Sequence, residues 1–317
     1  MTRIAVTSRS FSRHPVLRQE LIAVYPEVTF NDDGLKLTGD ELINFLRGHD
    51  KAITALEVLD AGVFAALAEL KVVSKYGVGF DSIDLKAMAT AEVKLGWTGG
   101  TNKRSVSELV ISFAVQLLRH TPEAGREVLD GTWRQHIGRQ LSDCTVGIVG
   151  CGHVGKDLGV LLRAFGCRVL AHDILDFPDY YREIGVEPMG LEELLKASDI
   201  VTLHLPIDDS TKNILSAERL CLMKPDAVLI NAARGGLVDE GALKAALTEG
   251  RLAGAALDVF AVEPPDDQGL LQLSNFIVTP HIGGSAEEAI LAMGRAAIDG
   301  LDNNQIPELG VFPPGAW

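Results

Sequence analysis

The chain has 317 residues, of which 47% are hydrophobic and 23% charged, so it can bury a substantial core and is not a disordered polymer. At roughly 150 residues per domain, this length predicts two domains. Asp and Glu outnumber Lys and Arg by 43 to 29, and the net charge of −14 argues against nucleic acid or an anionic membrane as the main partner. An acidic protein that binds a small anion must concentrate its cations and backbone N–H groups, so we expect a local positive pocket.

The first third of the chain alternates short β-branched runs with stretches of helical spacing. Such runs occupy residues 3–7, 51–54 and 71–74, and helical spacing is found between Leu17 and Val24. Alternation of strand and helix favours a parallel α/β sheet.

A longer helix is predicted over residues 105–119, where apolar residues recur every three or four positions. Thr101–Asn102 or Ser105 can cap its start. The pair Gly99–Gly100 precedes it and is expected to act as a hinge.

The second half alternates more regularly, which predicts a doubly wound parallel sheet. The expected strands cover residues 145–149, 168–172, 200–203, 227–231, 254–258 and 276–279. The expected helices cover residues 154–165, 190–196, 217–222, 240–249 and 286–301. Because the last helix follows the completed sheet, we expect it to return and pack on the first segment. The predicted domains are therefore a smaller one from residues 1–98 and 286–317 and an inserted one from residues 99–285.

The cysteines form neither a CxxC pair nor an even ladder, and no apolar run approaches the roughly 18 residues that span a bilayer. No charged-then-apolar leader opens the chain. These features predict a cytoplasmic protein with reduced thiols, no metal site and no membrane contact. The four cysteines are Cys144, Cys151, Cys167 and Cys221.

The most informative stretch is a glycine-rich turn between an expected strand and an expected helix, Gly150-x-Gly152-x-x-Gly155. In dinucleotide-binding turns the first glycine allows the tight turn, the second lets the backbone approach the pyrophosphate, and the third permits close helix packing. N–H groups at the helix start, around His153 and Val154, would meet the pyrophosphate charge. Glycine-rich turns are common, so the context of this motif decides its meaning.

A carboxylate at the end of the next strand supplies that context. Asp173 follows Gly155 by 18 residues, where it would accept hydrogen bonds from the adenosine ribose hydroxyls. Because Ile174 and Leu175 come next rather than Arg or Lys, a 2′-phosphate would meet an uncompensated negative charge. The sequence therefore favours NAD over NADP, the plainer alternative being that Asp173 only caps a loop.

Three polar residues follow expected strand ends in the second half: Arg234, Glu263 and His281. Ligands of doubly wound sheets bind at that edge. Hydride transfer between an alcohol carbon and a nicotinamide requires a base for the hydroxyl proton and a cation for the carboxylate of the acid. A histidine suits the first task, because its ordinary pKa of about 6.5 lets it exchange a proton near neutrality. Glu263 could hold the ring and favour its protonated form, and Arg234 offers a planar fork for a carboxylate.

Each of the three also has an ordinary structural explanation: a surface arginine, a loop charge before prolines and a core histidine. Together with the other motifs, however, the chain resembles the D-isomer-specific 2-hydroxyacid dehydrogenase family, which includes phosphoglycerate dehydrogenases. The resemblance runs nearly end to end. Its motifs are YGVGFD at residues 76–81, GTN at 100–102, the glycine turn at 150–155, HLP at 204–206, NAARGG at 231–236, LDV at 257–259 and PH at 280–281.

The resemblance implies a Rossmann-type doubly wound parallel sheet inserted into a smaller, discontinuous flavodoxin-like α/β domain. It implies a substrate held in the interdomain cleft, Arg234 as its clamp, Glu263 as the partner of His281, and His281 as the acid/base. It also implies a homodimer. The further cofactor residues are His204, Pro206, Ala232 and Asp258, the last near the nicotinamide carboxamide, and the further substrate groups are the backbone N–H groups of Val78 and Gly79.

Two departures from the family pattern bear on the substrate and the hinge. At Gly99–Gly100 a glycine replaces a proline that relatives often carry. Residues 53–56 hold no arginine, although phosphoglycerate-using relatives tend to carry one there for the phosphate. Lys75, directly before the substrate loop, could instead bind a second anionic group, or it could be a surface lysine whose stem lies along apolar surface.

We therefore expect an NAD-dependent oxidoreductase that interconverts a small 2-hydroxy acid and its 2-oxo acid, with His281 as acid/base. Phosphoglycerate dehydrogenase proper is an alternative within this class, and a phosphite oxidiser is a more distant one. From another class, an NAD-sensing co-repressor-like regulator stays open, because such proteins can keep the same three polar residues. Formate dehydrogenases are disfavoured, because they carry a Gln and His pair.

Overall fold

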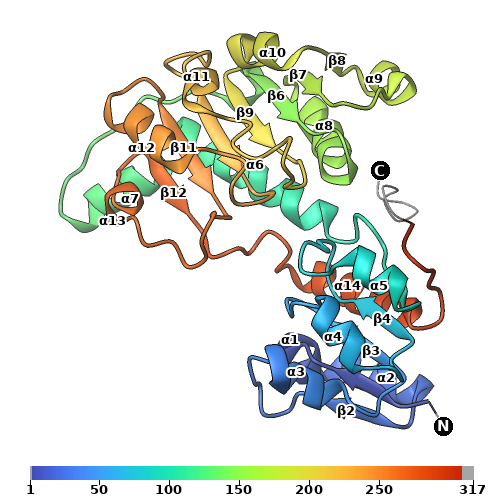
Figure 1. Ribbon diagram of the computed structural model, residues 1–317. Helices are drawn as coiled ribbons and strands as arrows, with labels where there is room; N and C mark the ends of the chain where they lie inside the picture. Colours follow the sequence, from blue (N-terminus) through green and yellow to red (C-terminus); the bar gives the residue numbers. More distant parts are fainter. Residues whose placement is uncertain (1, 309–317) are drawn as a thin grey trace. The chain divides into compact units, whose positions relative to one another are not determined.

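The computed structural model describes residues 2–308 and divides into two compact units (Figure 1). Unit 1 is Met1–Asn102 with Ala286–Trp317, and unit 2 is Lys103–Ser285. The first boundary falls four residues beyond the expected one, because residues 99–102 form a turn that ends where the next helix begins. The part of the expected smaller domain that covers residues 309–317 lies outside the described residues.

Unit 1 contains a five-stranded parallel sheet with the strand order β2-β1-β3-β4-β5. This 2-1-3-4-5 order is that of flavodoxin-like folds. The strands are β1 (Ile4–Val6), β2 (Val28–Phe30), β3 (Lys51–Thr54), β4 (Val72–Lys75) and β5 (Lys94–Gly96). The short β-branched runs predicted β1, β3 and β4, whereas β2 and β5 were not predicted.

Helices cover both faces of the unit 1 sheet. On one face α1, α2 and α14 pack on Ile4, Val6 and Ile53, and on the other α3, α4 and α5 pack on Ala5, Ala52 and Val73. These helices are α1 (Arg9–Arg13), α2 (Pro15–Val24), α3 (Gly39–Leu46), α4 (Ala61–Ala66), α5 (Leu85–Thr90) and α14 (Glu287–Gly300). The last helix therefore returns to the first segment, as expected from its place after the larger sheet.

Unit 2 contains a seven-stranded parallel sheet with the order β8-β7-β6-β9-β10-β11-β12. In chain order this is 3-2-1-4-5-6 with a seventh strand added, so the Rossmann-type prediction is confirmed. The strands are β6 (Thr145–Val149), β7 (Arg168–His172), β8 (Glu187–Pro188), β9 (Ile200–Leu203), β10 (Val228–Asn231), β11 (Gly254–Leu257) and β12 (Phe276–Val278).

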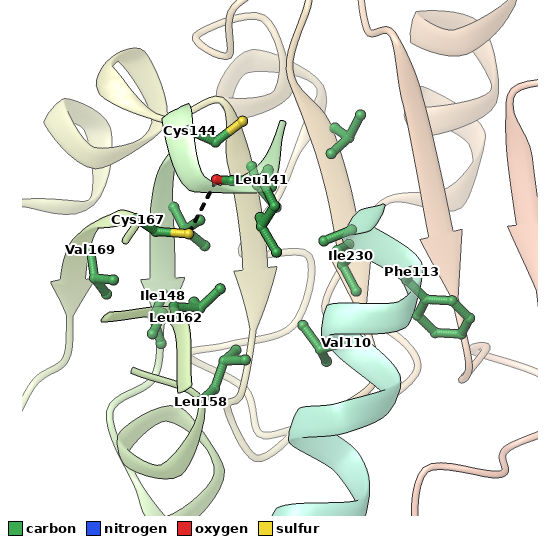
Figure 2. Close-up of a cluster of buried hydrophobic side chains, with 14 of the residues drawn as sticks. Val110, Phe113, Leu141, Cys144, Ile148, Leu158, Leu162, Cys167, Val169 and Ile230 are labelled. Carbon is green, nitrogen blue, oxygen red and sulfur yellow. Dashed lines mark hydrogen bonds between the residues drawn. The ribbon is translucent and has the colours of Figure 1, made fainter. Parts of the chain in front are cut away.

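Each face of the unit 2 sheet has its own hydrophobic core. One core lies under α6 and α8, where Val110, Phe113, Leu158 and Leu162 belong to one buried cluster with the strand residues Ile148 and Ile230 (Figure 2). The other lies under α10, α11 and α12. The helices of unit 2 are α6 (Lys103–Arg119), α7 (Thr121–Leu129), α8 (His153–Phe165), α9 (Pro178–Ile184), α10 (Leu191–Ala197), α11 (Ala217–Leu220), α12 (Glu240–Thr248) and α13 (Gln268–Leu271), with a 3-10 turn at Leu141–Asp143.

Two local expectations in unit 2 need revision. Ser105 does not cap α6, since it lies inside the first turn and its hydroxyl donates to the Gly283 carbonyl at 2.6 Å. Helix α7 was not predicted, and it buries none of its residues. No helix within residues 2–308 is long and apolar enough to cross a membrane.

Candidate active site

The glycine turn leads from β6 into α8. Gly150 has φ of +100°, a conformation that favours glycine, and a side chain there would collide with the His204 carbonyl. A Cβ at residue 155 would overlap the Gly150 carbonyl oxygen, so the helix packs tightly on the turn. At Gly152, by contrast, the added Cβ would meet open space. Gly152 is also the N-cap residue of α8 and offers no side-chain cap, so the N–H groups at His153 and Val154 start a helix suited to an anion.

Asp173 lies at the end of β7 beside this turn. Its Oδ2 accepts a hydrogen bond from the Cys151 N–H at 2.6 Å, and its Oδ1 accepts one from the Leu175 N–H at 2.9 Å. The carboxylate also lines a cavity of about 400 Å³ together with Asp176, and the cavity reaches Met189 on the far side. A cavity with two carboxylates and apolar walls can hold an adenosine and disfavours an added phosphate.

His204 follows β9 and packs against the glycine turn. Its ring Nε2 lies 3.0 Å from the Thr202 hydroxyl, and its backbone N–H donates to the Val149 carbonyl at 2.7 Å. Burial of the ring lowers the pKa of His204 from 6.5 to about 3, so the side chain is neutral at physiological pH. Pro206 follows on an exposed stretch, and its carbonyl accepts from the Thr211 hydroxyl at 2.8 Å.

Three neighbouring strands end in register at one edge of the sheet. Asn231 of β10 pairs with Leu257 of β11, and Leu257 pairs with Val278 of β12. The loops that carry Arg234, Glu263 and His281 therefore leave the sheet side by side. This is the carboxyl edge, where open parallel sheets bind ligands.

Hydrogen bonds from the Asn231 side chain hold the loop that carries Arg234. The Asn231 side chain donates to the Arg234 carbonyl at 2.8 Å and accepts from the Ala233 N–H at 3.1 Å, and Ala232 between them is buried. The Arg234 guanidinium donates to the Ala233 carbonyl at 2.7 Å. A side chain at Gly235 would overlap the Phe260 carbonyl, so this loop packs directly on the next one.

His281 and Glu263 form a hydrogen-bonded pair. The ring Nδ1 of His281 lies 2.9 Å from Oε2 of Glu263, and both side chains are partly exposed, at 50% and 40%. The second carboxylate oxygen of Glu263 accepts from the Phe260 N–H at 3.1 Å. With Nδ1 bound to the carboxylate, Nε2 is the ring nitrogen left for proton exchange with a ligand.

The backbone of His281 has φ of 55°, a left-handed conformation that is uncommon for residues other than glycine and concentrates at functional sites. The conformation is held by bonds from the His281 N–H to the carbonyls of Asp258 at 2.9 Å and Thr279 at 3.1 Å. The position of the imidazole is therefore determined by the loop.

The carboxylate of Asp258 holds that loop through hydrogen bonds. Its carboxylate is 1% exposed and accepts hydrogen bonds from the Thr279 hydroxyl at 2.5 Å, the Ile282 N–H at 2.7 Å and the Gly283 N–H at 2.7 Å. Both oxygens of Asp258 thus stabilise the segment around His281. Its contact with a nicotinamide carboxamide stays a prediction.

The expected substrate residues of unit 1 lie at the carboxyl edge of its own sheet. Lys75 ends β4, is 5% exposed and donates from Nζ to the Ala55 carbonyl at the end of the neighbouring strand, so it is not a surface lysine. After it, the Val78 carbonyl accepts from the Trp97 indole N–H at 2.9 Å. Among residues 2–308, the N–H groups of Val78 and Gly79 have no hydrogen-bond partner, which leaves them available to an anion.

Sequence reasoning missed the residues that hold the site together. Asn231 and Thr279 act through bonds to backbone or to another side chain across loops, and such bonds leave no spacing pattern. Their one sequence signal is position, because each stands at the end of an apolar strand beside a singled-out residue.

Comparisons with known proteins agree with this geometry. Residues 111–283 match the family described as D-isomer specific 2-hydroxyacid dehydrogenase, NAD binding domain. A glyoxylate reductase from Korarchaeum cryptofilum (strain OPF8) is 34% identical over 268 residues, which cover 82% of this chain and 81% of the relative. A solved structure from Polaromonas sp. JS6 66, described as a putative D-isomer specific 2-hydroxyacid dehydrogenase, has a TM-score of 0.87 at 28% identity and covers 96% of this chain and 99% of that one.

The D-3-phosphoglycerate dehydrogenase of Mycobacterium tuberculosis (strain ATCC 25618 / H37Rv) is 35% identical over 266 residues, which cover 83% of this chain and 50% of the relative. The chain thus spans about half the length of the phosphoglycerate dehydrogenases that it matches.

Proposed function

Because the chain belongs to the D-isomer specific 2-hydroxyacid dehydrogenase family, we propose that it is an NAD-dependent oxidoreductase that interconverts a small 2-hydroxy acid and its 2-oxo acid. The observation that carries the proposal is the 2.9 Å pair of His281 and Glu263, on a loop neighbouring that of Arg234 at one sheet edge. This chemistry requires a proton donor held by a carboxylate and a cation that binds the carboxylate of the substrate acid.

In the direction of reduction, His281 gives a proton from Nε2 to the carbonyl oxygen of the 2-oxo acid. Glu263 stabilises the protonated ring and fixes its orientation. The Arg234 guanidinium binds the carboxylate of the acid. The N–H groups of Val78 and Gly79 in unit 1 are proposed as further substrate-binding groups. When bound, NADH supplies the hydride to the carbonyl carbon.

The cofactor is held by the residues around the glycine turn. The open approach at Gly152 and the uncapped helix start accept the pyrophosphate, and the cavity beside Asp173 accepts the adenosine. His204, Pro206, Ala232 and Asp258 are proposed as further cofactor contacts. Two carboxylates in that cavity support NAD over NADP.

Lys75 is the residue on which we base the proposed substrate class. A buried ammonium at the carboxyl edge of the unit 1 sheet supports a 2-oxo acid with a second anionic group. Phosphoglycerate dehydrogenase proper is the alternative that the identity of about 35% to such enzymes supports. The absence of arginine from residues 53–56 weighs against it.

The protein is further proposed to be a homodimer. Helix α7 and the segment after it expose large apolar side chains, with Leu129 at 88%, Trp133 at 84% and Ile137 at 96%. This segment is folded back by the bond of 2.6 Å between His136 Nε2 and Glu127 Oε2, so it offers an ordered surface. Ordered apolar patches mark association surfaces, and size-exclusion chromatography of the Trp133→Ser, Ile137→Ser double variant would report a shift toward monomer.

A reducing compartment, the cytoplasm, is proposed as the location. Its support is that all four cysteines are free thiols, three of them buried.

A screen of NADH oxidation with glyoxylate, pyruvate, hydroxypyruvate, sulfopyruvate, oxaloacetate and phosphohydroxypyruvate tests the activity. Reduction of at least one of these is the expected result. If none is reduced with either NADH or NADPH and a protein partner binds tightly, the NAD-sensing regulator takes the place of the enzyme.

A further inference from the structure

The segment that carries Glu263 has little packing to hold it. Residues 261–264 are exposed, with Val262 at 68%, and the Glu263 side chain itself is partly exposed. Phe260, just before these residues, is buried in the core of unit 2 and its N–H donates to Glu263, so the turn is anchored at its start. The exposed residues after Phe260 depend on bonds to other elements to keep Glu263 in place against His281.

One such bond comes from Glu240. Its Oε1 accepts a hydrogen bond from the Ala261 N–H at 2.7 Å, two residues before Glu263 in the chain. Hydrogen bonds with an ionised acceptor are among the stronger ones in proteins. The bond spans 21 residues of sequence and ties the exposed turn to a helix.

Helix α12 is itself held in place by a side-chain cap and by a buried face. Glu240 is the first residue of α12, and the helix start is capped by Asp239, whose Oδ1 accepts from the Ala242 N–H at 2.9 Å. The inner face of α12 buries Leu243 and Leu247 in the core of unit 2. A glutamate in the first turn of a helix is also favoured by the helix dipole.

We infer that Glu240 is a positioning residue for the acid/base pair: through Ala261 it holds the turn at which Glu263 orients His281. The inference rests on the proposed function for its kinetic consequence but on the geometry alone for the placement of the carboxylate. Since a misplacement of about 1 Å can cost about 100-fold in rate, a loosened turn would be measurable.

Three substitutions separate this role from a general structural one. Glu240→Gln keeps an acceptor oxygen at the same distance and should retain kcat within about twofold. Glu240→Asp keeps the charge at the helix start but is one methylene too short, and it should lower kcat about tenfold, as should Glu240→Ala. Glu218→Ala removes a first-turn glutamate from α11, where its partner is the Ser216 hydroxyl, and serves as the matched control with unchanged kcat.

The separation of kcat from KM gives a readout that a general structural loss would not produce. The kcat for 2-oxo acid reduction should fall in Glu240→Asp but not in Glu240→Gln. The KM for NADH should stay within about twofold, because α12 does not carry a predicted cofactor residue.

A measurement independent of turnover distinguishes failure of this inference from failure of the proposed function. Histidine ring NMR at a single pH, with the His281 signal assigned from His281→Ala, should show a displaced His281 signal in Glu240→Asp but not in Glu240→Gln. An identical signal and kcat in Glu240→Asp and the unaltered chain, or equal impairment in Glu240→Gln and Glu240→Asp, would overturn the role of Glu240. If the displaced signal is present in a protein that reduces no 2-oxo acid, the role of Glu240 stands and the proposed function alone fails.

Discussion

Nδ1 of His281 lies 2.9 Å from Oε2 of Glu263, although the two residues stand on loops that leave different strands, β12 and β11. The bond commits one ring nitrogen to the protein and directs the other outward. Removal of the ring should abolish proton transfer while the cofactor residues stay in place.

His281→Ala should therefore lower turnover by about two to four orders of magnitude. NADH binding, followed by fluorescence titration, should stay within about twofold. His49→Ala removes a histidine of unit 1 that bonds the Thr29 hydroxyl and serves as control. Near-normal turnover in His281→Ala would remove this residue from the mechanism.

Glu263→Gln keeps the shape of the side chain but removes its charge, so the protonated ring of His281 loses its stabilising partner. The ring gives the proton in reduction, so kcat should fall by about 10- to 100-fold. Initial rates of 2-oxo acid reduction measure this, and an unchanged kcat would show that the carboxylate has no influence on the ring.

Asp173→Asn should raise the ratio of kcat/KM for NADPH to that for NADH by about tenfold, equivalent to about 1.4 kcal/mol, because one negative charge leaves the adenosine cavity. Asp176→Asn changes a second carboxylate that lines the same cavity and allows the two to be compared. If the native chain already prefers NADPH, the role given to Asp173 is wrong.

His204 predicts a pH dependence of stability. Burial lowers the pKa of its ring to about 3, whereas the unfolded chain binds the proton below about 6.5. Between these values the unfolded state holds more protons than the folded state. The free energy of unfolding therefore decreases as the pH is lowered, by up to about 1.4 kcal/mol per pH unit. Urea unfolding at pH 7, 6 and 5 should show a shallower decline in His204→Gln, and parallel declines would contradict the cause.

Lys75→Met removes the ammonium but keeps a long apolar stem at a buried position. We expect kcat/KM to fall at least about tenfold for oxaloacetate or phosphohydroxypyruvate, while that for glyoxylate stays within about twofold. Equal losses for all substrates would mean that Lys75 only maintains the fold through its bond to the Ala55 carbonyl.

Strands and motif residues could be predicted from the sequence because each leaves a local pattern. The apolar runs of β3, β6, β7 and β9 begin and end where the structure has them, since polar or small residues stand at their borders. The side chains at the ends of β10, β11 and β12 were singled out by type and position. Strand β8 was missed because two residues are too few to show a periodicity, and helix α7, which buries none of its residues, was missed as well.

The supports of the site could not be predicted in the same way. Nothing in the spacing between Glu240 and Ala261, or between Asp258 and Gly283, predicts that a side chain of one reaches the backbone of the other. Such bonds depend on how the parallel strands bring distant loops together, which is a property of the folded sheet. Asp258 was expected to serve the cofactor, and its bonds to the His281 loop emerged only from the structure.

The composition of unit 1 from two separate segments has a consequence for synthesis. Ser74 donates to the Ala297 carbonyl at 2.6 Å, and Leu17 packs against α14, so the core of unit 1 needs a helix that is synthesised after all of unit 2. When the ribosome has added residue 285, every residue of unit 2 has been made, while the earlier segment still lacks one wall of its core. The order in which the two units are completed is thereby the reverse of the order in which they begin.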